Sequence, residues 1–181
     1  MTCRFPKTDI RWELRRLRLA NLNIERIGEI LKDLRRLEVL DLSRNRLTTV
    51  SKRELDAFAT EIEELRLDGN RLYNVTGAFD AMKDLETLSL AGNRLKPFDD
   101  ETGLVTFPDT LMDKLDKLEN LDISNNSFTY IPERLAKAFG RGNHLNIGLK
   151  HNPFYCDYRI RPINTFMKLA PQAGRCPSEI R

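Results

Sequence analysis

The stretch Leu37-Glu-Val-Leu40-Asp-Leu42-Ser-Arg-Asn45-Arg-Leu47 contains the pattern that decides the fold. Apolar residues stand at its positions 1, 4, 6 and 11, and an asparagine stands at position 9. Positions 4 and 6 have the period-2 spacing of a β-strand with one buried face. Because side chains alternate between the two faces of a strand, we expect positions 3, 5 and 7 to point outward.

The same pattern recurs along the chain. Three further full copies and two degenerate copies begin at Ile62, Leu85, Leu118, Leu14 and His144. In the degenerate copies, Leu22 replaces the asparagine and His144 replaces the first apolar residue. An internal repeat of this length predicts a solenoid of stacked coils, in which equivalent strands form one parallel sheet.

This repeat closely resembles the leucine-rich-repeat family between about Glu13 and Phe154. The resemblance implies an α/β solenoid shaped as a horseshoe, with a parallel β-sheet on the concave face and short helices or turns on the convex face. We expect an N-terminal cap or remnant at 1–13, about six repeats at 14–154, and a C-terminal cysteine cap at 155–181.

The asparagines at position 9 are expected to be structural. An asparagine side chain carries both donors and an acceptor, so it can satisfy the backbone groups left unpaired where each coil leaves the sheet. These residues are Asn45, Asn70, Asn93, Asn126 and Asn152.

The connecting segments carry helix and core signals. Ser51 to Glu54 has the spacing of a capping box, which marks the start of a helix. Phe58, Phe79 and Phe139 are predicted to fill the core of the solenoid.

One coil is longer than the others. Successive position-9 residues are 23 to 26 residues apart, except for the 33 residues between Asn93 and Asn126. The excess lies near 96–110, where proline and glycine accompany three consecutive acids and several apolar residues. This segment is either a plain loop or a binding loop, because long insertions in a regular scaffold are often functional. The candidate binding residues are Asp99, Asp100, Glu101, Leu104 and Phe107.

The segment from Asn152 to Cys176 looks like the cysteine-containing C-terminal cap of extracellular leucine-rich-repeat proteins. The resemblance implies a disulfide between Cys156 and Cys176, although Tyr158 stands where that family commonly has another cysteine. Cys3 is left over as a cap remnant, a free thiol or an intermolecular link. A zinc site formed by the other two cysteines and His151 is the less favoured alternative.

These features favour a secreted or cell-surface protein, with an intracellular scaffold as the alternative. A disulfide requires an oxidising compartment, and glycosylation sequons begin at Asn74 and Asn125. The start of the chain lacks the apolar core of a signal peptide, and no uncharged run approaches the ~18 residues that span a bilayer. We therefore expect no transmembrane segment in this chain.

The net charge of +3 conceals an acidic middle between basic ends. Residues 1–60 carry 14 Lys and Arg against 9 Asp and Glu, 61–125 carry 7 against 15, and 126–181 carry 9 against 3. A nucleic-acid binder usually presents a continuous basic stripe, so we expect no nucleic-acid partner.

Catalytic signatures are missing from the sequence. An enzyme needs a nucleophile with a base, a metal cluster or a phosphate cradle, and the chain has only two histidines and no glycine motif for phosphate. We therefore expect a non-catalytic protein without a cofactor or a metal ion.

Binding is assigned to the outward side of the sheet. The candidate residues on the concave face are Arg16, Arg18, Glu38, Asp41, Glu63, Glu64, Arg66, Glu86, Ser89, Glu119 and Asp122. Four glutamates occupy position 2 of successive copies, which indicates either a solvated face or an acidic stripe that attracts a protein partner with a basic surface.

A second candidate surface is a basic patch at the C-terminal cap, which suits a sulfated glycan. Its residues are Lys150, His151, Arg159, Arg161, Lys168 and Arg175. The predicted function is macromolecular recognition by a receptor, adhesion or innate-immune type of protein. The alternatives are an intracellular scaffold or regulator and a glycan-binding protein of the extracellular matrix.

Overall fold

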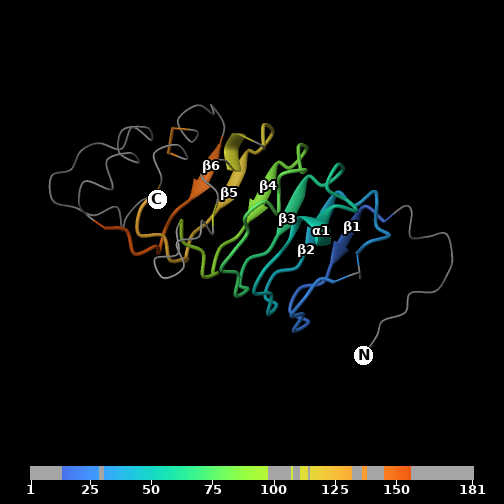
Figure 1. The fold of residues 1–181 in the computed structure, drawn as a ribbon, viewed down its shortest axis with the longest axis horizontal. Coiled ribbons are helices and arrows are strands. Elements are labelled where there is room, and N and C mark those ends of the chain that lie inside the picture. Colours follow the sequence, from blue (N-terminus) through green and yellow to red (C-terminus); the bar gives the residue numbers. More distant parts are fainter. Residues whose placement is uncertain are drawn as a thin grey trace.

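The computed structural model describes residues 14–28, 31–97, 107, 111–113, 115–131, 136–137 and 145–155. Within them, one parallel sheet has the strand order β1-β2-β3-β4-β5-β6 (Figure 1). The strands are β1 (Arg16–Arg18), β2 (Val39–Asp41), β3 (Glu64–Arg66), β4 (Thr87–Ser89), β5 (Asn120–Asp122) and β6 (Asn146–Gly148). Each strand comes from one copy of the repeat, so the predicted parallel sheet is confirmed.

The register stacks equivalent positions of successive coils. Leu40 pairs with Leu17 on one side and with Leu65 on the other. Leu40 and Leu65 are fully buried, whereas Leu17 and Ile147 in the outermost strands are half-buried. The core is therefore a continuous column of leucine layers under the sheet, and burial of such side chains supplies about 1.5–3 kcal/mol each.

The position-9 asparagines tie each coil to the one before it, as predicted. Asn70 Nδ2 donates to the carbonyls of Leu42 (3.0 Å) in the preceding coil and Leu67 (2.9 Å) in its own. Its Oδ1 accepts the backbone N–H of Leu47 at 3.1 Å. The same three-way bridge recurs at the other four positions. In the first coil, Leu22 occupies this position with its side chain exposed.

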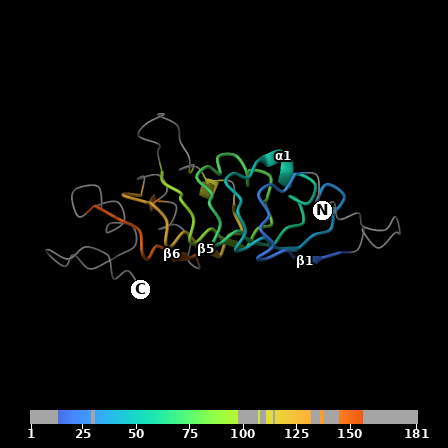
Figure 2. The same ribbon diagram turned by 90° about the horizontal axis from the view of Figure 1, so that it is seen from below.

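The side opposite the sheet contains little helix (Figure 2). The described residues include the α-helix α1 (Lys52–Leu55), the 3-10 turn η2 (Leu111–Asp113) and the helical residues Ala136 and Lys137, and the other described connections are turns and loops. The carboxylate of Glu54 accepts the N–H and the hydroxyl of Ser51 at 3.0 and 2.7 Å, which is the acidic half of the predicted capping box. The horseshoe curvature stays a prediction.

Phenylalanines fill the space behind the sheet. Phe58 and Phe79 are buried as predicted, and Phe139 lies outside the described residues. Phe107, which the sequence suggested as a binding-loop residue, is 1% exposed and packs edge-to-face on Phe128 with the ring centroids 5.2 Å apart. This aromatic pair makes Phe107 a core residue instead, because its buried ring contributes packing rather than a contact surface.

Candidate functional site

The outward face of the sheet is hollowed into an open groove of about 870 Å³ that crosses β3 to β6. Most of its lining comes from positions 3, 5 and 7, which is where the repeat places outward side chains. The polar residues that line it include Asp68, Thr87, Ser89, Asn120, Asp122 and Asn146.

A row of hydrogen bonds fixes the polar lining across three strands. Asn146 Nδ2 donates to Asn120 Oδ1 at 3.1 Å, and Asn120 Nδ2 donates to Thr87 Oγ1 at 3.3 Å. These side chains stand next to one another because β4, β5 and β6 pair in register at this position. The groove therefore presents its amide and hydroxyl groups in one preset orientation.

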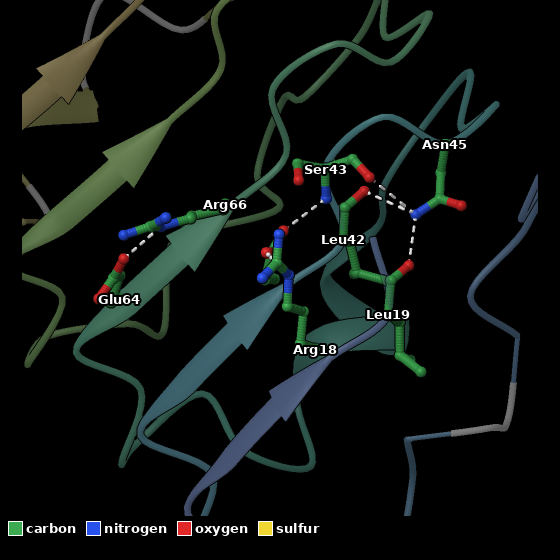
Figure 3. A network of polar contacts seen from close by, with 8 residues as sticks. Arg18, Leu19, Leu42, Ser43, Asn45, Glu64 and Arg66 are labelled. Atoms are coloured by element: carbon green, nitrogen blue, oxygen red, sulfur yellow. Dashed lines mark hydrogen bonds and ion pairs between the residues drawn. The ribbon is translucent and has the colours of Figure 1, made fainter. Parts of the chain in front are cut away.

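Charged residues on the first three strands are paired with one another. Arg18 Nε lies 3.1 Å from Asp41 Oδ2, and Arg66 is bound to Glu64 (Figure 3). In the same region, Glu38 accepts a hydrogen bond from the Arg15 guanidinium of the preceding coil. The predicted contact residues on β1 to β3 are thus largely engaged within the face itself.

Asp41 is the most enclosed of these charges, with 8% of the residue exposed. Burial alone would raise its pKa. The side-chain and backbone hydrogen bonds of Ser43, one of them at 2.9 Å to Oδ1, and then the guanidinium groups of Arg18 and Arg66 outweigh burial and hold the pKa of Asp41 below its ordinary value. The carboxylate is therefore ionised and neutralised by its neighbours.

Three exposed glutamates follow one another at position 2. Glu63, Glu86 and Glu119, which we call the acidic stripe, form no ion pair with any residue in the described part of the chain. Lys117 Nζ donates to Asp84 at 2.6 Å beside the stripe. That hydrogen bond and the charge of Asp84, followed by the charges of Glu86 and Glu63, raise the pKa of Lys117. Asp84 is thus the main cause of the raised pKa, and two glutamates of the stripe add to it.

The remaining sequence candidates are distributed as follows. Arg16 is exposed on β1, and Lys150 and His151 are exposed in the last described coil. Asn74 accepts the N–H of Thr76 at 2.9 Å, and Asn125 is exposed. Outside the described residues lie Cys3, Asp99, Asp100, Glu101, Leu104, His144, Cys156, Arg159, Arg161, Lys168, Arg175 and Cys176.

A column of left-handed residues at position 8 was not anticipated. Every coil has a positive φ there, between 51° and 66°. The residues are Asn21, Arg44, Gly69, Gly92, Asn125 and His151. Glycine and asparagine tolerate this conformation best, so their presence in four of the six copies was a signal that the sequence did contain.

Two family models match the chain. One described as a leucine rich repeat matches residues 13–72, and a second of the same description matches residues 117–138. The matched segments are leucine-rich repeats. They contain four of the six strands of the sheet, whereas β4 falls between the two matches and β6 falls after them. All six strands stack in one sheet.

Known proteins resemble this chain in part. Protein PAC2 of Saccharomyces cerevisiae is 29% identical over 156 residues, which cover 73% of this chain and 26% of that protein. A crystal structure of a plant ice-binding protein superposes with a TM-score of 0.52 and 25% identity, covering 67% of this chain and 36% of that one. The chain thus spans about a quarter of the length of the yeast protein.

Two further features concern the described residues alone. No helix among them is long and apolar enough to cross a membrane. The same residues contain no group of three or more His, Cys, Asp or Glu side chains that could hold a metal ion.

Proposed function

We propose that this chain is a non-catalytic recognition module that binds a protein partner with a basic surface through the outward face of its sheet. Leucine-rich repeats commonly serve protein–protein interaction. The observation that carries the proposal is the acidic stripe. Its three carboxylates stand on neighbouring coils about 4.8 Å apart and repel one another. Positive side chains of a partner relieve that repulsion and are steered toward the face before contact.

The scaffold suits this task because the face is preformed. Five asparagine bridges fix the coils relative to one another, and the backbone loses little freedom when a partner docks. A rigid surface therefore needs fewer favourable contacts to reach a given affinity.

The acidic stripe is tested with a double charge reversal. The biotinylated chain is screened against an array of purified proteins from the same source, and the affinity of each hit is remeasured with Glu63→Lys combined with Glu86→Lys. We expect at least a ten-fold loss, mainly from a slower association rate. The matched control, Asp56→Lys with Asp80→Lys, makes the same charge change on the exposed connecting segments that precede β3 and β4 and should bind like the wild type.

If both double variants bound the partner as tightly as the wild type, the outward face of the sheet would not be the binding surface. Loss of binding in both would mean that net charge, rather than the stripe, decides the affinity. Retention on heparin that survives the stripe variant but is lost on neutralising Arg159, Arg161 and Lys168 would instead favour the glycan-binding alternative.

For the compartment, we propose the outside of the cell, on the resemblance of the segment after Asn152 to an extracellular cysteine cap. The intracellular scaffold would use the same face of the sheet without a disulfide. Intact mass with an alkylating label, before and after reduction, separates the two. One free thiol with Cys156 linked to Cys176 supports the extracellular module, whereas three free thiols in protein from its native source support the scaffold. The same spectra report a glycan on Asn74 or Asn125.

A further inference from the structure

Two aspartates of the sheet are held in the same way by the backbone, but only one of them has arginine side chains beside it. Asp41 and Asp122 both occupy position 5 of their coils. Each accepts, through Oδ1, the backbone N–H of a serine two residues later, Ser43 or Ser124, at 2.9 Å. The two side chains are therefore anchored in the same way and turned in the same direction.

The neighbours of the two aspartates differ. The strands beside Asp41 place Arg18 and Arg66 next to it at position 5. The strands beside Asp122 place Ser89 and Gly148 at those same two positions. In the described part of the chain, no basic side chain forms an ion pair with Asp122.

Gly148 leaves the space that the Asp122 side chain uses. A Cβ atom at that position would lie 2.4 Å from Asp122 Oδ1 and 2.8 Å from its Cγ, so the carboxylate leans over the backbone of β6. On β2, arginines of the neighbouring strands lie beside Asp41. The corresponding space beside Asp122 is part of the open groove. The groove thus leaves open space beside an anchored carboxylate, at the place where arginines lie beside Asp41.

We propose that the groove beside Asp122 receives an arginine side chain of the partner protein, placed against Asp122 as Arg18 is placed against Asp41. This inference rests on the proposed function, since it assigns one contact of the docked partner. The Arg18 pair supplies the geometry, with Nε 3.1 Å from Oδ2. A guanidinium carries five donors, and the groove offers further acceptors on Asp68, Ser89 and Asn146.

Arg66 is the only basic side chain among the described residues that line the groove, and it is bound to Glu64. Its guanidinium is therefore engaged at the β3 end, and the β4 to β6 end retains the charge of Asp122 without compensation. A desolvated, bidentate contact of arginine with a carboxylate is among the stronger polar interactions at protein interfaces.

The test uses Nα-acetyl-L-arginine methylamide as the probe and the neutral isostere Nα-acetyl-L-citrulline methylamide as its control. The ¹⁵N-labelled chain is titrated with each at constant ionic strength, and amide chemical shifts are followed. We expect the arginine probe to shift the amides of 120–124 and 146–148 at least three-fold more than citrulline does. Shifts spread over the whole sheet, or equal shifts with both probes, would overturn the proposal.

Three variants sharpen the result. Asp122→Asn should reduce the response to the citrulline level, while Asp116→Asn, which removes one exposed acid from the segment that precedes β5, should leave it unchanged. Ser89→Arg should also abolish the response, because an arginine at that position supplies Asp122 with the internal partner that Arg18 gives Asp41. This third variant removes no native contact, so it tests the site even if Asp122→Asn folds poorly. Retained probe binding in Ser89→Arg would count against the proposed geometry.

The outcome is separable from that of the proposed function. If the stripe variant loses its protein partner but the arginine probe gives no localised shift, the recognition module stands and the arginine subsite is wrong. If the probe binds at Asp122 but the stripe variant keeps full affinity for the partner, the subsite exists and the stripe is not part of the interface.

Discussion

The first three strands and the last three strands of the sheet share a backbone plan but treat charge in opposite ways. On β1 to β3, charged side chains of neighbouring coils pair with one another, as Arg18 does with Asp41. On β4 to β6, Asp122 has serine and glycine beside it, and Glu86 and Glu119 are exposed. In a solenoid, the residue one coil away therefore decides whether a charge is satisfied internally or is available to a partner.

The largest effect should come from the scaffold that both regions share. Asn93 connects the coils of β3 and β4. Asn93→Ala leaves the N–H of Leu72 without its partner and removes one of the two asparagine donors from the carbonyls of Leu67 and Leu90. We expect the free energy of unfolding in urea to fall by about 2–3 kcal/mol, since a buried N–H without a partner is costly and two further hydrogen bonds are lost. Leu22→Asn, at the exposed equivalent in the first coil, should change it by less than about 0.5 kcal/mol. Equal losses in the two variants would mean that the bridges do not hold the regions together.

A smaller effect should separate the two aspartates directly. Asp41→Asn removes a nearly buried charge that forms an ion pair with Arg18 and is attracted by Arg66, and we expect a loss of about 1–2 kcal/mol. Asp122→Asn keeps an oxygen acceptor for Ser124 and disrupts no internal ion pair, so its cost should be below about 0.5 kcal/mol. Urea denaturation of both variants at pH 7 makes the measurement. If the two losses are equal, the charge pairing on the first strands adds nothing to stability.

The pH dependence of this pair follows from the lowered pKa of Asp41. A carboxyl group whose pKa is lower in the folded state contributes stability that is fully present above its unfolded value, near 3.8, and disappears as the pH falls through the folded value. The gap between wild type and Asp41→Asn should therefore be constant from pH 7 to about pH 5 and close in more acidic solution. A gap that widens in acid would contradict the assigned direction.

The smallest effect on stability should come from giving the last three strands the charge pairing of the first three. Ser89→Arg gives Asp122 the neighbour that Asp41 already has, and we expect about 0.5 kcal/mol of added stability, as is usual for a partly exposed ion pair. The gain should fade in high salt, where charges are screened. Thermal unfolding of Ser89→Arg and of Ser89→Gln, at low and high salt, isolates the contribution of the charge.

The sequence predicted the sheet because its signals are local and repeated. Period-2 leucines define a strand with a buried face, and the asparagine that recurs in five of the six copies needs backbone partners, which a neighbouring coil supplies. It did not predict the contact that buries Phe107, since an apolar residue in a loop rich in proline and glycine gives no indication of which surface it meets. The proposed protein partner, the acidic stripe as a contact and the arginine subsite stay predictions.

The sequence predicted only part of the difference in charge pairing between the first three strands and the last three. The residues at positions 2 and 5 of successive coils could be predicted from the repeat. The pairing of Arg66 with Glu64 in its own strand could not, because it depends on the length and conformation of the two side chains. The serine that anchors each aspartate was a missed signal, because Asp41-Leu-Ser43 and Asp122-Ile-Ser124 repeat the same three-residue motif.

The asparagine bridges also bear on how the number of coils can change by duplication. Each bridge contacts its own coil and the one before it and nothing farther away, so a coil of this kind can be copied into the array beside any other without disturbing distant parts. The first coil is different, because Leu22 has no group with which to bridge backward. Duplication of an interior coil should therefore lengthen the solenoid and preserve the asparagine bridges. A copy of the first coil placed in the interior would leave one pair of neighbouring coils without a bridge.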